Sequence, residues 1–144
     1  MNIRKWFWGG EDIHSRFANI GLLLLRVFAG LAMAFGHGIK KIPPSDQFIA
    51  GVAKLGFSLP ELFAWAAGIS EFVGGLLLAF GLLTRPSAFF ILFTMLVAGF
   101  IRHAGDPFTI KEKAFLYAFV ALLFLIIGAG RYGLDAILRR HKKE

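Results

Sequence analysis

The chain has 144 residues, 57% of them hydrophobic, with 17 phenylalanines, no cysteine and a net charge of +7. Soluble domains are about 45–50% apolar, and the excess here falls in continuous Leu-rich blocks, which predicts membrane-spanning helices and argues against a β-barrel. The lack of cysteine excludes disulfides, thiol redox chemistry, cysteine-ligated clusters and covalently attached haem from this chain. A redox role would therefore need a bound or diffusing cofactor.

Four long apolar runs organise the sequence into successive parts. The segment before them combines Trp6 and Trp8 with basic residues, a composition typical of an anchor at the membrane surface. In chain order we expect an interfacial anchor over residues 1–16, a transmembrane domain over 17–138 with spans at about 17–38, 62–83, 86–103 and 113–131, and a basic tail over 139–144.

A long connection separates the first two spans. The Pro-Pro pair at 43–44 stops the first helix, and Ser45 can cap a short helix with Phe48, Val52 and Leu55 on one face. This spacing predicts an amphipathic helix that lies on the outer surface like a lid. The predicted fold is all-α: an integral membrane four-helix bundle with a short amphipathic surface helix in its first outer loop.

Two short motifs mark where later spans begin. Ser58-Leu59-Pro60-Glu61 and Thr109-Ile110-Lys111-Glu112 each place a hydroxyl residue three positions before a glutamate, which is the pattern of a capping box. We therefore expect Ser58 and Thr109 to cap the second and the fourth span.

The basic residues outside the spans indicate the orientation. Lysine and arginine are more numerous on the side of the two termini than on the opposite side, which predicts that both termini are cytoplasmic. The expected location is the cytoplasmic (inner) membrane of a bacterium or archaeon, crossed several times. For the basic tail, anionic lipid is a simpler partner than nucleic acid.

Two ionisable residues lie inside apolar runs, Arg26 in the first and Glu71 in the second. Hydrocarbon penalises a lone ion, so such residues usually face a partner or a cavity. We expect Arg26 and Glu71 to form a buried ion pair. This pair could shape a ligand site, or it could only fix the register of the two helices.

A second polar group is expected at the outer end of the bundle. His37 and His103 end the first and the third span, and four further residues lie near them as rim contributors: Lys40, Arg102, Glu112 and Tyr117. Lys40 can be explained as a snorkelling side chain that reaches the membrane surface, and Glu112 as part of a capping box. The two histidines could instead donate hydrogen bonds to a quinone headgroup or exchange protons with it. A b-type haem held by His37 and His103 stays open, and a metal site lacks a third ligand.

These motifs together resemble the DoxX family of small membrane proteins. The matching residues are Arg26 with Gly30, Phe35-Gly36-His37-Gly38 with Lys40, Glu71 with Gly74-Gly75, Leu83-Thr84-Arg85-Pro86, His103, Asp106-Pro107-Phe108, Glu112 and Gly128 to Asp135. The resemblance runs from about Gly21 to Leu138. It implies a four-helix membrane protein and a link to quinones, because some relatives are subunits of thiosulfate:quinone oxidoreductase and others are linked to quinone or oxidative stress.

We therefore expect an inner-membrane protein that binds a quinone or a similar lipophilic redox molecule through His37, His103, Arg26 and Glu71. It would act as the membrane subunit of an oxidoreductase whose catalytic centre lies on a partner chain. Membrane lipid and a second copy of the chain are further expected partners, and nucleic acid is not. Two other functions stay open: a non-enzymatic scaffold or assembly partner, and a small transporter of a weak acid, an anion or protons.

Overall fold

The structure, a computed structural model, describes residues 13–141. Residues 1–12, most of the expected interfacial anchor, and residues 142–144 of the expected tail lie outside the described residues. The described part has helices and loops but no strand. Its elements are α2 (Arg16–Gly36), the 3-10 helix η1 (Gly38–Lys41), α3 (Asp46–Lys54), α4 (Pro60–Phe80), α5 (Thr84–Val97), the π-helix η2 (Ala98–Arg102), α6 (Phe108–Ile127) and α7 (Leu134–His141).

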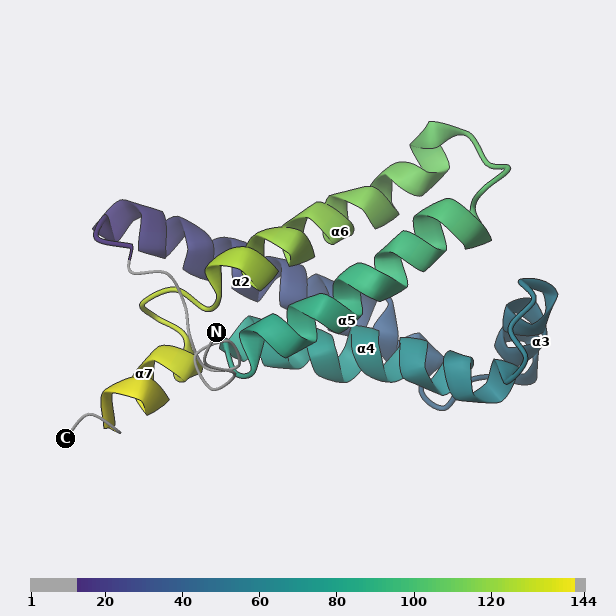
Figure 1. The fold of residues 1–144 in the computed structure, drawn as a ribbon, viewed down its shortest axis with the longest axis horizontal. Helices are drawn as coiled ribbons and strands as arrows, with labels where there is room; N and C mark the ends of the chain where they lie inside the picture. Colours follow the sequence, from purple (N-terminus) through teal and green to yellow (C-terminus); the bar gives the residue numbers. More distant parts are fainter. Residues whose placement is uncertain (1–12, 142–144) are drawn as a thin grey trace.

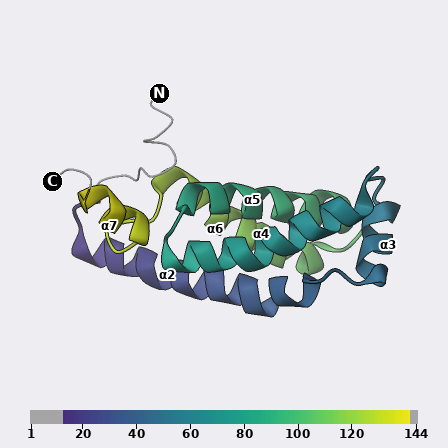
Figure 2. The ribbon, with the colours of Figure 1, turned by 90° about the horizontal axis from the view of Figure 1, so that it is seen from below.

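The four long helices form an up-and-down bundle in which each packs mainly on the next, in the order α2, α4, α5 and α6. Helices α5 and α6 run side by side and diverge from α2 and α4 toward the end that carries α3 (Figure 1). The opposite end carries α7 (Figure 2). Buried side chains from all four helices, among them Met33, Leu78, Ile91 and Phe124, fill the centre. The predicted four-helix bundle is confirmed.

The outer surface of the bundle is apolar. Large side chains such as Phe28, Phe89 and Phe93 stay exposed on it, and lipid tails can cover such side chains as well as protein does. Within residues 13–141, three helical segments are long and apolar enough to cross a membrane: Arg16–Lys41, Pro60–Phe80 and Thr84–Arg102. Helix α6 has 20 residues but carries Lys111, Glu112 and Lys113 in its first two turns.

Glycines let α2 and η1 lie directly against the backbone of α4. A Cβ on Gly30 would stand 2.5 Å from the carbonyl oxygen of Gly75, and a Cβ on Gly38 would overlap the backbone of Phe72. Small residues permit such close approach between helices in lipid. These two contacts fix the antiparallel register of α2 on α4, with Gly38 beside Phe72 and Gly30 beside Ala79.

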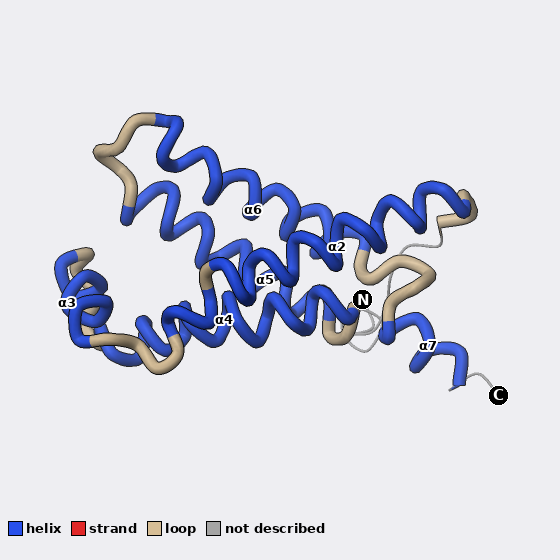
Figure 3. Tube along the Cα trace, turned by 180° about the vertical axis from the view of Figure 1, so that it is seen from behind, coloured by secondary structure: helices blue, strands red, loops and turns tan. Residues whose placement is uncertain are grey.

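Helix α3 is the predicted amphipathic surface helix, and it lies across one end of the bundle (Figure 3). Ser45 caps it, since Ser45 Oγ accepts a hydrogen bond of 3.3 Å from the backbone N–H of Phe48. Val52 is buried beneath the helix, whereas Asp46 and Lys54 are exposed. The predicted cap and inward face of this helix are confirmed.

The capping boxes expected at the start of the second and the fourth span are wrong. Helix α4 has Leu59 as its N-cap and α6 has Pro107, and neither receives a side-chain capping hydrogen bond. Proline explains the start of α4, because Pro60 in the first turn already has the φ angle that a helix requires. Helix α7 was not expected from the sequence, and it includes residues 139–141 of the expected tail.

Candidate functional site

A cavity of about 610 Å³ lies between α3, α4 and the continuous α5–η2 helix, at the end of the bundle opposite α7. Small-molecule sites usually span about 300–1,000 Å³ and combine apolar walls with a few placed polar groups. The wall here is mostly apolar and includes five phenylalanines: Phe48, Phe57, Phe63, Phe90 and Phe93. Its main polar members are Lys41, Ser70, Glu71, Thr94, Arg102 and His103.

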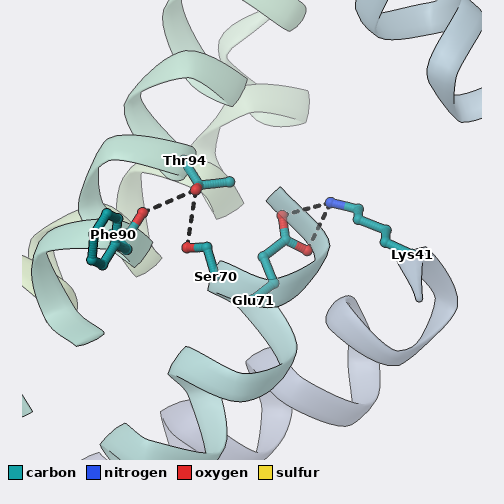
Figure 4. A network of polar contacts seen from close by, with 5 residues as sticks. All are labelled: Lys41, Ser70, Glu71, Phe90 and Thr94. Carbon is teal, nitrogen blue, oxygen red and sulfur yellow. Dashed lines mark hydrogen bonds and ion pairs between the residues drawn. The ribbon is translucent and has the colours of Figure 1, made fainter. Parts of the chain in front are cut away.

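Glu71 and Lys41 form an ion pair on the wall of this cavity. Lys41 Nζ donates to both carboxylate oxygens of Glu71, at 2.5 and 2.7 Å (Figure 4). The Glu71 side chain is 1% exposed and that of Lys41 is 30% exposed. An ammonium has three N–H donors, so Lys41 keeps one for another acceptor while it holds the carboxylate. The pair therefore stabilises a carboxylate in the protein interior and still offers a donor.

Local structure explains how Lys41 reaches a side chain in the middle of α4. Because Gly38, the first residue of η1, lies against the α4 backbone at Phe72, this turn starts next to Glu71. Lys41 is the last residue of that turn. Its ammonium also lies 5.4 Å from the ring centroid of Phe48 on α3, a cation–π contact. One lysine thus touches both the buried carboxylate and the helix that covers the cavity.

A hydroxyl pair continues the polar wall from α4 to α5. Thr94 Oγ1 lies 3.0 Å from Ser70 Oγ and 2.9 Å from the carbonyl oxygen of Phe90, one turn earlier in α5 (Figure 4). Ser70 precedes Glu71 in the chain and is 7% exposed. The two hydroxyls and the carboxylate form a short polar strip on an otherwise apolar wall.

His103 closes the other side of the cavity. The π-helix η2 ends at Arg102, and the backbone N–H of His103 donates to the carbonyl oxygen of Ala98 at 3.0 Å. His103 Nδ1 lies 2.6 Å from Asp106 Oδ2, and both side chains are partly exposed. A carboxylate on one ring nitrogen orients the imidazole and leaves the other nitrogen for a second partner. His103 and Asp106 therefore form a dyad between the cavity and the outside.

The expected ion pair between Arg26 and Glu71 is wrong. Arg26 is 1% exposed and donates from Nη1 to the carbonyl oxygens of Leu78 at 3.2 Å and Ala79 at 3.0 Å. Its Nη2 donates to the carbonyl oxygen of Tyr132 at 3.4 Å. The register of α2 on α4 places Arg26 at the C-terminal end of α4, about two helical turns beyond Glu71. Arg26 therefore ties helix ends together and does not line the cavity.

The other expected site residues divide between the cavity and its surroundings. Glu71, His103 and Arg102 line the cavity, whereas His37, Lys40, Glu112 and Tyr117 do not. His37 instead packs edge-on against Tyr117, with 5.7 Å between ring centroids. No ligand contact tests any of these residues, so their binding roles stay predictions.

Three of the main polar residues of the cavity escaped the sequence analysis: Lys41, Ser70 and Thr94. A signal for Lys41 was present, because the small residues of the first two spans match in the antiparallel register that places Gly38 beside Phe72. That match brings the residues after Gly38 next to Glu71. Ser70 and Thr94 carry no such signal, since isolated hydroxyl residues are common in membrane helices.

The fold and the cavity define a helical membrane protein with a partly polar internal site. The family model DoxX matches residues 21–104, and the chain belongs to the DoxX family. It is 28% identical to "Inner membrane protein YqjF" of Escherichia coli over 134 residues, 90% of this chain and 95% of the relative. It is 30% identical to "Putative oxidoreductase CatD" of Bacillus subtilis over 126 residues, 87% of this chain and 92% of the relative. No solved structure matches the chain.

Proposed function

We propose that this protein binds a quinone or a similar lipophilic redox molecule in the cavity between α3, α4 and α5–η2. The observation that carries the proposal is the cavity itself, where a buried ion pair and two hydroxyls stand on a phenylalanine-rich wall. A quinone matches this cavity chemically, because its flat apolar ring suits the phenylalanine-rich wall and its two carbonyl oxygens can accept hydrogen bonds from the polar residues. The name of one relative, "Putative oxidoreductase CatD", agrees with a redox ligand.

The polar residues suggest how such a ring would be held. One carbonyl would accept from the remaining N–H of Lys41 or from Ser70, which lie on the α4 side of the cavity. The second would face His103, which Asp106 orients. Reduction of a quinone takes up protons, and the His103–Asp106 dyad connects the cavity with partly exposed groups that can exchange them. The electrons would come from a catalytic centre on a partner chain.

The proposed topology has four spans in the inner membrane, with both termini in the cytoplasm. Helix α6 would be the fourth span, because it packs along α5 and its three charged residues lie only in its first turns. The cavity would then open near the outer surface, where α3 covers it. Phe90 and Phe93 line the cavity and are more than half exposed on the lipid-facing side, which suggests that a ligand can enter from the bilayer.

A quinone-binding titration of the unchanged protein and of a variant with a larger side chain in the cavity tests the proposal. The purified protein in neutral detergent would be titrated with a ubiquinone analogue that carries a ten-carbon tail, and bound quinone would be measured after rapid size exclusion. Gly51 lines the cavity and a Cβ there meets no atom within 4 Å. Gly51→Leu should therefore place a bulky side chain in the cavity without disturbing the backbone and weaken binding by at least about tenfold.

Two carboxamide variants sharpen the result. Glu71→Gln should weaken quinone binding, whereas Glu61→Gln should not, because Glu61 is exposed in the first turn of the same helix. Absence of quinone binding by the unchanged protein would overturn the proposal and favour a scaffold. Binding that Gly51→Leu leaves intact would exclude this cavity as the site. Flux of a weak acid into liposomes that Glu71→Gln abolishes would point to a transporter.

A further inference from the structure

We infer that the end of the bundle that carries α7 is a binding site for anionic phospholipid in the adjacent leaflet. This site lies at the opposite end of the molecule from the cavity and does not depend on the proposed ligand. Three independent features of the described residues support it: the charge at this end, an apolar stripe on α7, and the contacts that fix α7 in place.

The first feature is an excess of positive charge. Besides the buried Arg26, four arginines whose side chains the structure describes lie at this end, each at least partly exposed: Arg16, Arg85, Arg131 and Arg139. Among the described side chains here the one carboxylate is Asp135, which is 2% exposed. The end that carries α3 is different, because its lysines and Arg102 stand among five carboxylates: Asp46, Glu61, Glu71, Asp106 and Glu112. A surface on which arginines outnumber carboxylates attracts anions such as lipid phosphates.

The second feature is an apolar stripe on α7. Leu134, Ile137 and Leu138 follow the i, i+3, i+4 spacing of one helix face and are 40%, 46% and 43% exposed. The other side of the helix faces the protein, where Asp135 and Ala136 are buried. An amphipathic helix with basic neighbours and an uncovered apolar stripe is typical of the boundary between headgroups and acyl chains. Nucleic acid would satisfy the arginines but leave the stripe in water.

The third feature is the rigid attachment of α7 to the ends of the spanning helices. Asp135 accepts hydrogen bonds from the backbone N–H groups of Leu83 at 2.8 Å and Thr84 at 2.9 Å, where α5 begins. Its own N–H donates to the carbonyl oxygen of Gly81 at 2.8 Å. Arg26 adds its bond to Tyr132, just before α7. The stripe is therefore held where α4 ends and α5 begins, at the level of the membrane surface.

The position of the arginines fits a lipid headgroup beside this stripe. The backbone N–H of Arg131 donates to Asn19 Oδ1 at 2.8 Å, which brings Arg131 next to the first turn of α2. Arg16 lies one turn before Asn19 on the same helix. Both arginine side chains belong to exposed residues. A phosphate could thus be bound by guanidinium groups from two segments while its acyl chains cover the stripe.

The test compares how tightly two lipids bind to the full-length protein. Purified protein in neutral detergent would be titrated with dioleoyl phosphatidylglycerol or dioleoyl phosphatidylcholine, and bound lipid would be counted by native mass spectrometry. The anionic lipid should bind more tightly. Arg16→Gln with Arg131→Gln should weaken its binding by roughly thirtyfold, since each surface cation contributes a factor of about five. Lys54→Gln with Lys113→Gln removes the same charge at the other end and should change binding little.

Two further arms test whether the site binds the whole lipid or its phosphate alone. Leu138→Ser removes part of the apolar stripe but no charge, so it should weaken both lipids alike and leave their affinity ratio unchanged. Inorganic phosphate at the same concentration should not displace phosphatidylglycerol. Equal affinity for the two lipids, equal losses in the two double variants, or displacement by inorganic phosphate would each overturn the inference.

Discussion

The ion pair between Glu71 and Lys41 predicts an asymmetric response to mutation. Glu71 is 1% exposed, and Lys41 provides the two hydrogen bonds to its carboxylate. Lys41→Met would leave that carboxylate buried without its counter-charge, whereas Glu71→Gln would leave a lysine that is 30% exposed and can reach polar surroundings. Loss of Lys41 should therefore destabilise the protein more than loss of Glu71.

The magnitudes follow from the burial of each group. Removing the partner of a buried charge costs about 3–5 kcal/mol, which is the expected loss in the free energy of unfolding for Lys41→Met. Glu71→Gln should cost about 1 kcal/mol, the net value of a hydrogen bond whose other partner stays partly solvated. The double variant Lys41→Met, Glu71→Gln buries no charge at this position and should also lose only about 1 kcal/mol. The interaction energy of the cycle should then be about 3–5 kcal/mol.

Reversible unfolding in mixed micelles, followed by far-UV circular dichroism during titration with sodium dodecyl sulfate, measures these differences. Lys40→Met is the matched control, because Lys40 is the exposed neighbour of Lys41, and it should change stability by less than about 0.5 kcal/mol. A cost for Lys41→Met no larger than that of Lys40→Met, or larger for Glu71→Gln than for Lys41→Met, would falsify this account of the pair.

Three further variants test the packing and the caps. Gly38→Ala should lower the free energy of unfolding by about 1–3 kcal/mol, because its Cβ meets the α4 backbone, whereas Gly36→Ala meets no atom within 4 Å and should not destabilise. Ser45→Ala should cost α3 about 1 kcal/mol and speed amide hydrogen exchange in its first turn, and Ser58→Ala, which removes no cap, should leave exchange in α4 unchanged. Asp135→Asn offers one acceptor oxygen where the carboxylate used two. Amide hydrogens in the first turn of α5 should therefore exchange faster, and the free energy of unfolding should fall by about 1–2 kcal/mol. Unchanged amide exchange in that turn would contradict the capping role.

Much of the fold could be predicted because the signals are local. Continuous apolar runs long enough for a bilayer can form only helices there, since every backbone polar group must find its partner within the segment. Ser45 and the spacing of Phe48 and Val52 predicted the surface helix in the same way. The capping boxes failed because Pro60 and Pro107 start their helices without a side-chain hydrogen bond. Helix α7 was missed because its contact, through Asp135 to the start of α5, is distant in sequence.

The site was harder to predict because it depends on how the helices rotate and slide against one another. Arg26 and Glu71 have opposite charges on consecutive spans, yet the register set by Gly30 and Gly38 places them about two turns apart. The partner of Glu71 is Lys41 in η1, which lies outside the apolar runs, where one lysine among several does not stand out. His103 and Glu71 were found because an ionisable residue in or beside an apolar run stands out in any register.

The π-helix before His103 has a consequence for how this cavity can change between relatives. A π-turn contains one residue more than an α-turn, so every side chain after it is rotated by about 100° from the path of an uninterrupted helix. Deletion of a single residue between Ala98 and Arg102 would turn the π-turn into an α-turn and leave His103 beside the cavity and Asp106. If the turn became an α-turn with no residue deleted, the imidazole would rotate away from the cavity, without any substitution among the residues that pack the core.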